Sequence, residues 1–217
     1  MLVSRIMTKN PVFVEPSMPV SEARSLMEKE KIGRLPVIDA HKNLTGLITK
    51  KDLLKAGPSP ATSLDMYEIS YLLSKLTVDK VMTKNVITIA ENDVVEEAAR
   101  IMAAHDISCL PVMRGTLLVG IITGTDLFHA FVDAFGGRRH GIRVTLLMDD
   151  KPGELARVAG ALSERGGFIE AFITHRGDEL SHKRGTFKIT GLDQKTVESI
   201  AAALGAQIED IMQADAK

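Results

Sequence analysis

The chain of 217 residues has no tryptophan, and aromatic residues make up only 4% of it. Its single cysteine, Cys109, excludes an intrachain disulfide and favours a reducing compartment, so we expect a cytoplasmic protein. The formal net charge of −1 provides no field that would draw the chain to nucleic acid or to an anionic membrane. An uncharged apolar stretch of about 18 residues and an apolar signal core are both missing, so we expect no membrane insertion.

Patterns that carry chemistry are also scarce. The histidines lack metal-ligand spacing, so we predict no metal site; they are His41, His105, His129, His140, His175 and His182. We find no nucleophile–base spacing, P-loop or dinucleotide fingerprint, and we therefore predict no catalytic residues and no enzyme activity. Hydrophobic residues, in contrast, make up 45% of the chain, which is enough for aliphatic cores in more than one unit.

An internal repeat fills the first part of the sequence. Residues 7–37 and 82–112 are identical at 12 of 31 positions without a gap. Each copy contains Met-Thr-Lys-Asn, a β-branched stretch, an amphipathic helix pattern and the end Ile-x-x-Leu-Pro-Val. The helix patterns place these residues on one face: Val20, Ala23, Leu26 and Met27, and in the second copy Val95, Ala98, Ile101 and Met102. The repeat predicts two β-α-β-β-α units that pack against each other.

Each copy closes with Gly, two apolar residues, Thr, two variable residues and Asp, at residues 46–52 and 120–126. A short apolar run followed by Thr-x-x-Asp is typical of a buried strand that leads into a helix. One interpretation is that the Thr and Asp form a capping box for that helix. The other is that an anion or a ribose docks beside the hydroxyl, the carboxylate and free backbone N–H groups. The occurrence of two matched copies favours the second interpretation.

A different pattern follows the repeats. Residues 136–141 mark a hinge, and residues 142–217 alternate between strand and helix patterns in the order βαββαβ, which predicts an antiparallel sheet with both helices on one face. Residues 63–76 predict an amphipathic helix between the repeats. The predicted domains are repeat 1 (1–56), a linker with a helix (57–77), repeat 2 (78–135), the hinge (136–141) and the last unit (142–217).

The paired Leu-Pro-Val and Gly-h-h-Thr-x-x-Asp elements, where h is apolar, resemble a tandem pair of CBS domains, the Bateman module. The last unit resembles an ACT domain through Asp-Lys-Pro-Gly-Glu-Leu at 150–155 and a glycine-rich helix end. The order CBS, CBS, ACT is similar to that of acetoin-utilisation proteins. The resemblance implies an α+β protein in which the CBS repeats form a pseudo-two-fold pair, followed by a ferredoxin-like ACT domain.

A CBS pair implies an adenine nucleotide or a related ligand in the cleft between the repeats. The resemblance implies that Asp52 and Asp126 accept hydrogen bonds from the ribose hydroxyls. It also implies that Thr49 and Thr123 contact the ribose or a phosphate. It assigns the pocket walls to Thr8, Asn10, Val12, Leu35, Pro36, Thr83, Asn85, Ile87, Leu110 and Pro111. The implied ligands are AMP, ADP or ATP, with S-adenosylmethionine or NAD as further options, and no cofactor is required.

The copies differ in charge. Arg34 matches a position that resembles phosphate-binding arginine sites in nucleotide-sensing CBS pairs, and its counterpart is Cys109. Lys50 and Lys51 also have uncharged counterparts in the second copy. We expect one site that recognises phosphate and a second that is weaker, empty or uncharged. The alternative for Arg34 is a solvated surface arginine, and for the two lysines solvation is the favoured interpretation. We interpret Cys109 as a small buried filler rather than a reactive thiol.

In the ACT-like unit, the resemblance places amino-acid binding in the turn that holds Asp150, Lys151 and Gly153. Phe168 stands where many amino-acid-binding ACT domains carry Asn, so pairing with a second chain is an equal alternative. We therefore predict a ligand-sensing regulator, a homodimer, whose protein partner the sequence does not name. The rival functions are an amino-acid-responsive regulator with a structural CBS pair and a nucleic-acid binder that uses two small basic clusters, Arg138, Arg139 and His140, and Lys183 and Arg184.

Overall fold

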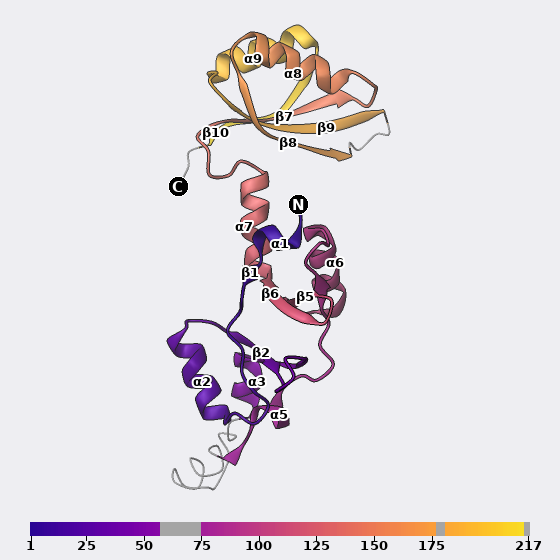
Figure 1. Cartoon of the computed structure of the whole chain (residues 1–217). Helices are drawn as coiled ribbons and strands as arrows, with labels where there is room; N and C mark the ends of the chain where they lie inside the picture. Colours follow the sequence, from indigo (N-terminus) through magenta and orange to yellow (C-terminus); the bar gives the residue numbers. More distant parts are fainter. Residues whose placement is uncertain (57–74, 177–180, 215–217) are drawn as a thin grey trace. The chain divides into compact units, whose positions relative to one another are not determined.

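The computed structural model describes residues 1–56, 75–176 and 181–214. Its described part divides into two compact units, Met1–Leu127 and Phe128–Lys217, with the boundary inside helix α7 (Gly124–Ala134). Both units are drawn in Figure 1. The helix predicted over residues 63–76 lies outside the described residues, apart from its last two positions.

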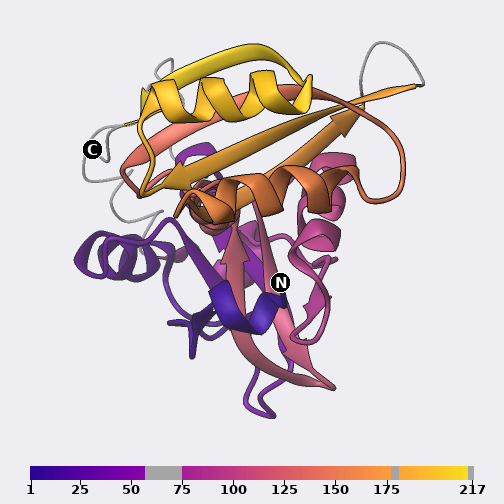
Figure 2. The same ribbon diagram turned by 90° about the horizontal axis from the view of Figure 1, so that it is seen from above.

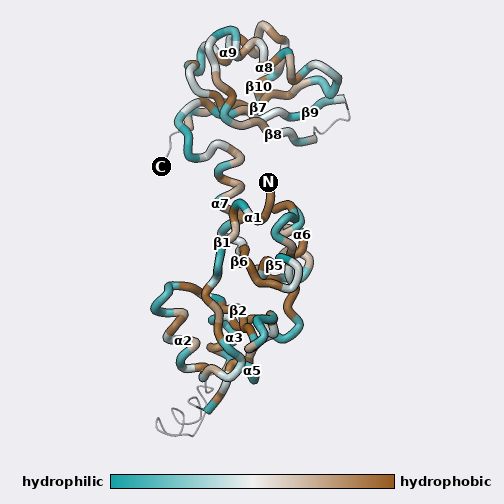
Figure 3. The backbone as a smooth tube through the Cα atoms, viewed as in Figure 1, coloured by the Kyte–Doolittle hydropathy of each residue, from teal (hydrophilic) through white to brown (hydrophobic). Residues whose placement is uncertain are grey.

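The first copy of the repeat contains α1 (Val3–Ile6), β1 (Thr8–Lys9), α2 (Val20–Lys29), β2 (Arg34–Ile38), β3 (Leu44–Thr49) and α3 (Lys50–Lys55). The second copy contains α5 (Val78–Val81), β4 (Ile89–Ala90), α6 (Val95–His105), β5 (Cys109–Arg114), β6 (Leu117–Thr123) and α7. Helices α2 and α6 bury Ala23, Met27, Ala98 and Met102, so the predicted apolar faces are confirmed. In Figure 3 the strands β5 and β6 are largely brown, as expected of buried strands.

The predicted strands at the start of each copy are shorter than expected. Val12 and Phe13 are exposed, and only Val14 forms a bridge, with Val37. Of the stretch predicted over residues 86–89 in the second copy, only Ile89 lies in a strand, β4, which also includes Ala90. The β-branched residues before these points lack a neighbouring strand, and β-propensity without such a partner does not form a ladder.

The two copies exchange their first segments. Strand β1 pairs with β6 of the second copy, and Val3 and Met7 lie in the core of the second copy. Likewise, Thr83 forms a bridge with Leu47, and Val78 lies in the core of the first copy. This reciprocal exchange, together with a small cluster at Leu47, Cys109 and Ile121, joins the repeats into one unit.

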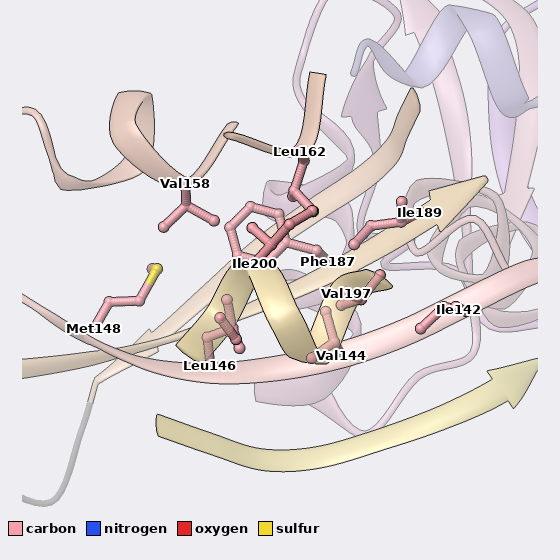
Figure 4. Packing of buried hydrophobic residues seen from close by; sticks show 11 residues of the cluster. Ile142, Val144, Leu146, Met148, Val158, Leu162, Phe187, Ile189, Val197 and Ile200 are labelled. Atoms are coloured by element: carbon pink, nitrogen blue, oxygen red, sulfur yellow. The ribbon is translucent and has the colours of Figure 1, made fainter. Parts of the chain in front are cut away.

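The second unit has its own core. Strands β7 (Gly141–Asp149), β8 (Phe168–Arg176), β9 (His182–Thr190) and β10 (Gln207–Ala214) form an antiparallel sheet in the order β10-β7-β9-β8. Helices α8 (Glu154–Glu164) and α9 (Gln194–Leu204) lie side by side on one face of the sheet, as predicted (Figures 1 and 2). Side chains of both helices, such as Leu162 and Ile200, point toward Phe187 of β9 (Figure 4).

Candidate functional site

The first unit contains two cavities that are made from both repeats. The larger, which we call the Thr49 cavity, has a volume of about 530 Å³. It is bounded by Gly33, Arg34, Leu47, residues 49–52, Thr83, residues 85–87 and residues 106–109. The smaller, which we call the Thr123 cavity, has a volume of about 320 Å³ and is bounded by Thr8, residues 10–12, residues 31–34, Ile121 and Thr123.

The two cavities are built alike. In the Thr49 cavity, the Thr-x-x-Asp motif of the first repeat meets the segments 83–87 and 106–109 of the second repeat. In the Thr123 cavity, Thr123 of the second repeat meets the segments 8–12 and 31–34 of the first repeat. The exchange of first segments brings these parts together, because Thr8 pairs with Ile121 and Thr83 with Leu47.

Both Thr-x-x-Asp motifs form capping boxes. The Thr49 hydroxyl donates to Asp52 Oδ2 at 2.7 Å, the Thr49 backbone N–H donates to the same oxygen at 2.9 Å, and the Asp52 N–H donates to Thr49 Oγ1 at 3.3 Å. The Thr123 and Asp126 pair repeats these bonds at 2.7, 2.8 and 3.4 Å. The boxes fix the orientation of each carboxylate, because Oδ2 accepts two hydrogen bonds from the same threonine.

The expectation of free backbone N–H groups at these helix starts is wrong for two positions in each helix. Besides the Asp N–H groups, the Lys50 N–H donates to the Gly33 carbonyl at 2.9 Å, and the Gly124 N–H donates to the Ser108 carbonyl at 3.0 Å. These carbonyls come from the segments just before β2 and β5, so each bond ties the motif to the neighbouring strand of its own repeat. Anion binding in these cavities must therefore use side chains more than the helix ends.

Arg34 lines both cavities. Its Nη2 donates to Ser108 Oγ at 2.8 Å, so the guanidinium extends from the first repeat to the second. Its counterpart Cys109 is 5% exposed. Burial raises the pKa of the Cys109 thiol, and the charge and hydrogen bond of Arg34 oppose this shift only in part. Cys109 is thus a buried neutral thiol at neutral pH, as the filler interpretation requires.

The structure brings most of the predicted site residues to a cavity wall. The Thr49 cavity includes Arg34, Thr49, Asp52, Thr83, Asn85 and Ile87, and the Thr123 cavity includes Thr8, Asn10, Val12, Arg34 and Thr123. Asp126, bonded to Thr123, is outside the set of residues that bounds the Thr123 cavity. Leu35 and Leu110 are fully buried in the two cores, and Pro36 and Pro111 are also buried, so these four predicted wall residues lie outside the sets that bound the two cavities.

Several wall residues were not recognised from the sequence. Lys31 and Asp106 occupy equivalent positions after α2 and α6, and both have a left-handed backbone, with φ of 54° and 51°. Lys31 bounds the Thr123 cavity and Asp106 bounds the Thr49 cavity. Their position four residues before the leucine of the repeated Leu-Pro was visible in the alignment of the copies. The charge reversal between them was a further sign that the two sites differ.

A third cavity, of about 770 Å³, lies in the second unit between the turn after β7 and the turn before β10. Lys151 and Gly153 bound this cavity, whereas Asp150 pairs with Lys183 at 3.0 Å. Lys151 donates to Asp149 Oδ2 at 2.6 Å, and this bond lowers the pKa of Asp149 and raises that of Lys151. Glu154 is buried and pairs with Arg157, which also donates to the Leu204 carbonyl at 2.8 Å. The charged groups of this cavity therefore already have partners.

The basic clusters considered for nucleic acid are all paired with acidic residues. Arg138 meets Asp133 at 3.0 Å, Arg139 meets Glu170 at 3.8 Å, and Arg184 meets Glu209 at 2.6 Å. Within the described ranges, no group of three or more His, Cys, Asp or Glu side chains could hold a metal ion. None of the helices that the structure describes has both the length and the apolar character needed to cross a membrane.

Comparison with known proteins gives two matches to the CBS domain model, at residues 3–59 and 78–133. The CBS domain pair of protein MJ0100, solved with 5′-methylthioadenosine and S-adenosyl-L-methionine, is 31% identical with a TM-score of 0.52, over 64% of this chain and 98% of that one. CBSX2, solved with AMP, is 31% identical with a TM-score of 0.50, over 60% of this chain and 96% of that one.

Among curated relatives, an L-aspartate semialdehyde sulfurtransferase of Methanocaldococcus jannaschii is 32% identical over 139 residues, which is 64% of this chain. The match spans only 24% of that enzyme's length. The domain matches coincide with the repeats that form the two cavities. The chain belongs to the family of proteins that contain tandem CBS domains.

Proposed function

We propose that this chain is a non-catalytic regulator that binds an adenine nucleotide or a related adenosyl ligand in the Thr49 and Thr123 cavities. The observation that carries the proposal is the pair of Thr-x-x-Asp capping boxes, each at a cavity that residues of both repeats bound and that includes Arg34. The CBS pairs of MJ0100 and CBSX2, which were solved with adenosyl ligands, support the same ligand class.

The chemistry of the walls fits such a ligand. Asp52 holds Thr49 with Oδ2, and its Oδ1 would accept the vicinal ribose hydroxyls. The base would lie against apolar side chains such as Val86 and Ile87 in the Thr49 cavity. A phosphate would meet Arg34, with Lys50 and Lys51 at the same cavity. AMP, ADP and ATP combine all three features, and S-adenosylmethionine and NAD share the adenosine part.

The output of binding would be a change in assembly or in a protein partner. We propose that the chain forms a homodimer and that the C-terminal unit, which has the βαββαβ order of an ACT domain, relays the change. Its assignment as an ACT domain, its role in acetoin metabolism and the identity of a partner are predictions from the resemblance. A nucleic-acid function has less support, because Arg138, Arg139 and Arg184 pair with acidic residues.

A second candidate is amino-acid sensing in the cavity of the C-terminal unit, since Lys151 and Gly153 bound it. A ligand carboxylate would have to compete with Asp149 for Lys151, and a ligand ammonium would have to compete with Arg157 for Glu154. Melting curves with each of the common amino acids separate this function from nucleotide sensing. A shift with an amino acid and none with adenosyl ligands would favour the second candidate.

The nucleotide proposal is tested by melting the full chain with AMP, ADP, ATP, S-adenosylmethionine, NAD and adenosine. A ligand at 100 times its Kd adds about 2.7 kcal/mol to the free energy of unfolding, which raises the melting temperature. The double variant Asp52→Ala, Asp126→Ala should lose this ligand-induced rise. Asp193→Ala is the matched control, because Asp193 also caps a helix, α9, but lies in the second unit.

Asp193→Ala should lower the starting melting temperature and keep the ligand-induced rise in full. A double Asp52, Asp126 variant that responds like the wild type would show that the ribose assignment is wrong. If none of the adenosyl ligands shifts the wild-type melting temperature, the proposed function itself fails.

A further inference from the structure

Arg34 is the arginine at which the two cavities meet. It belongs to the bounding residues of both the Thr49 and the Thr123 cavity. Its side chain is partly buried, and its bond to Ser108 directs the guanidinium to the rim of the Thr49 cavity. One cation is therefore positioned where two ligands can reach it.

The second repeat has no arginine at the position that corresponds to Arg34. Arg34 and Thr49 face each other across β2 and β3, and in the second repeat Cys109 and Thr123 face each other across β5 and β6. By this register, Cys109 occupies the position at which a symmetric pair of sites would carry its other arginine. The Cys109 thiol is buried and its pKa is raised, so it adds no charge to either cavity at neutral pH.

The remaining charges differ between the cavities. The Thr49 cavity is bounded by two lysines, Lys50 and Lys51, and by two aspartates, Asp52 and Asp106. The described residues that bound the Thr123 cavity include Lys31 and no carboxylate. Without Arg34, the Thr49 cavity is thus balanced and the Thr123 cavity has a single exposed lysine. A phosphate in either cavity depends on Arg34 for its planar, two-pronged contact, because lysine acts only as a point charge.

We infer that the two cavities compete for Arg34, so that a phosphorylated ligand bound in one weakens the binding of a phosphorylated ligand in the other. The inference rests on the proposed nucleotide binding and adds a rule of regulation to it. The first phosphate takes the Thr49 cavity, which is the larger and toward which Arg34 already points. The Thr123 cavity then prefers an adenosyl ligand without a phosphate. The chain thereby responds to two kinds of adenosyl ligand together.

Calorimetric titration of the full chain with adenosine and with AMP tests this inference. Adenosine should bind at two independent sites without Arg34, because the ribose would meet Asp52 in one cavity and Thr123, which Asp126 orients, in the other. AMP should bind in two steps, the second at least about tenfold weaker than the first beyond the statistical factor, as expected for loss of a hydrogen-bonded charge. Arg34→Ala should weaken the first AMP binding step and so remove the gap between the affinities of the two steps. Arg100→Ala, which removes an arginine paired with Glu97 on α6, is the control and should keep the gap.

The Arg34 variant separates this inference from simple repulsion between two phosphates. If repulsion caused the gap, removal of the arginine would leave the gap unchanged or widen it, and the inference would be overturned. A second measurement uses Asp52→Ala, which weakens ligand binding in the Thr49 cavity. In this variant AMP should bind the Thr123 cavity about tenfold more tightly than it does in the second step of the wild type, because Arg34 is then available to the phosphate in that cavity. An equal affinity would count against competition.

The outcomes distinguish the inference from the proposed function. Two independent AMP steps beside two adenosine steps would overturn competition for Arg34 and leave nucleotide sensing intact. A single adenosine site would also overturn the inference, because competition requires two cavities that bind. Binding of neither ligand would overturn the proposed function, and the inference with it.

Discussion

Met82 of the second repeat packs directly against Gly46 of the first. A Cβ built on Gly46 would lie 2.3 Å from Met82 Sδ, and a Cβ on Gly120 would lie 2.4 Å from Met7 Sδ. The glycine that opens each Gly-h-h-Thr-x-x-Asp motif therefore leaves room for the methionine of the Met-Thr-Lys-Asn motif in the other repeat. This contact explains why the glycine of one motif and the methionine of the other both recur in the two repeats.

The first prediction is that Gly46→Ala lowers the free energy of unfolding by about 1 kcal/mol, the low end of the cost of overpacking, because the atoms it meets belong to the flexible side chain of Met82. The cost should fall when Met82 is also changed to Ala, because the clashing side chain is then gone. Chemical denaturation of the wild type, both single variants and the double variant gives the coupling energy between the two positions. The control is Gly124→Ala, because a Cβ at Gly124 would meet no atom within 4 Å. Gly115→Ala is unsuitable as a control, because the φ of Gly115 is 60° and an alanine there would be strained. Additive effects of Gly46→Ala and Met82→Ala would contradict the contact.

The second prediction concerns the pH dependence of stability. The folded state raises the pKa of Cys109 by burial, so above the ordinary thiol pKa, near pH 8.5, the unfolded chain binds fewer protons than the folded chain. The Cys109 contribution to the free energy of unfolding is therefore complete below about pH 8 and falls as the pH rises further. Denaturation at neutral and alkaline pH should show a steeper alkaline loss for the wild type than for Cys109→Ala. Equal slopes would show that the thiol keeps its ordinary pKa.

The third prediction is that the full chain is a homodimer with a mass of twice 23.6 kDa. The sheet of the second unit has edge strands β8 and β10 within the described residues, and edges of this kind pair readily with a second copy. Light scattering on the full chain and on the fragments 1–135 and 141–217 measures the assembly of each part. A monomeric full chain would exclude the dimer. A monomeric 141–217 fragment at high micromolar concentration would show that this unit does not pair by itself.

The order of elements was largely predictable because it depends on local patterns. The helix face at Ala23 and Met27 follows from the 3.6-residue period, and the strand that ends at Thr49 follows from an apolar run before a capping box. The same holds for the βαββαβ order of the second unit. Strand lengths near Val12 were not predictable, because a ladder needs a partner strand that the local sequence does not reveal.

The sequence by itself determined that the Thr-x-x-Asp motif occurs twice, from which we predicted two matched sites, and that the charges beside the two copies differ, since Arg34 matches Cys109. Only the tertiary structure decided which segments form each site and that Arg34 borders both. The physical reason is that Met7 and Met82 can pack against Gly120 and Gly46 only across the repeats. That choice depends on contacts between residues far apart in the chain, which no local period specifies.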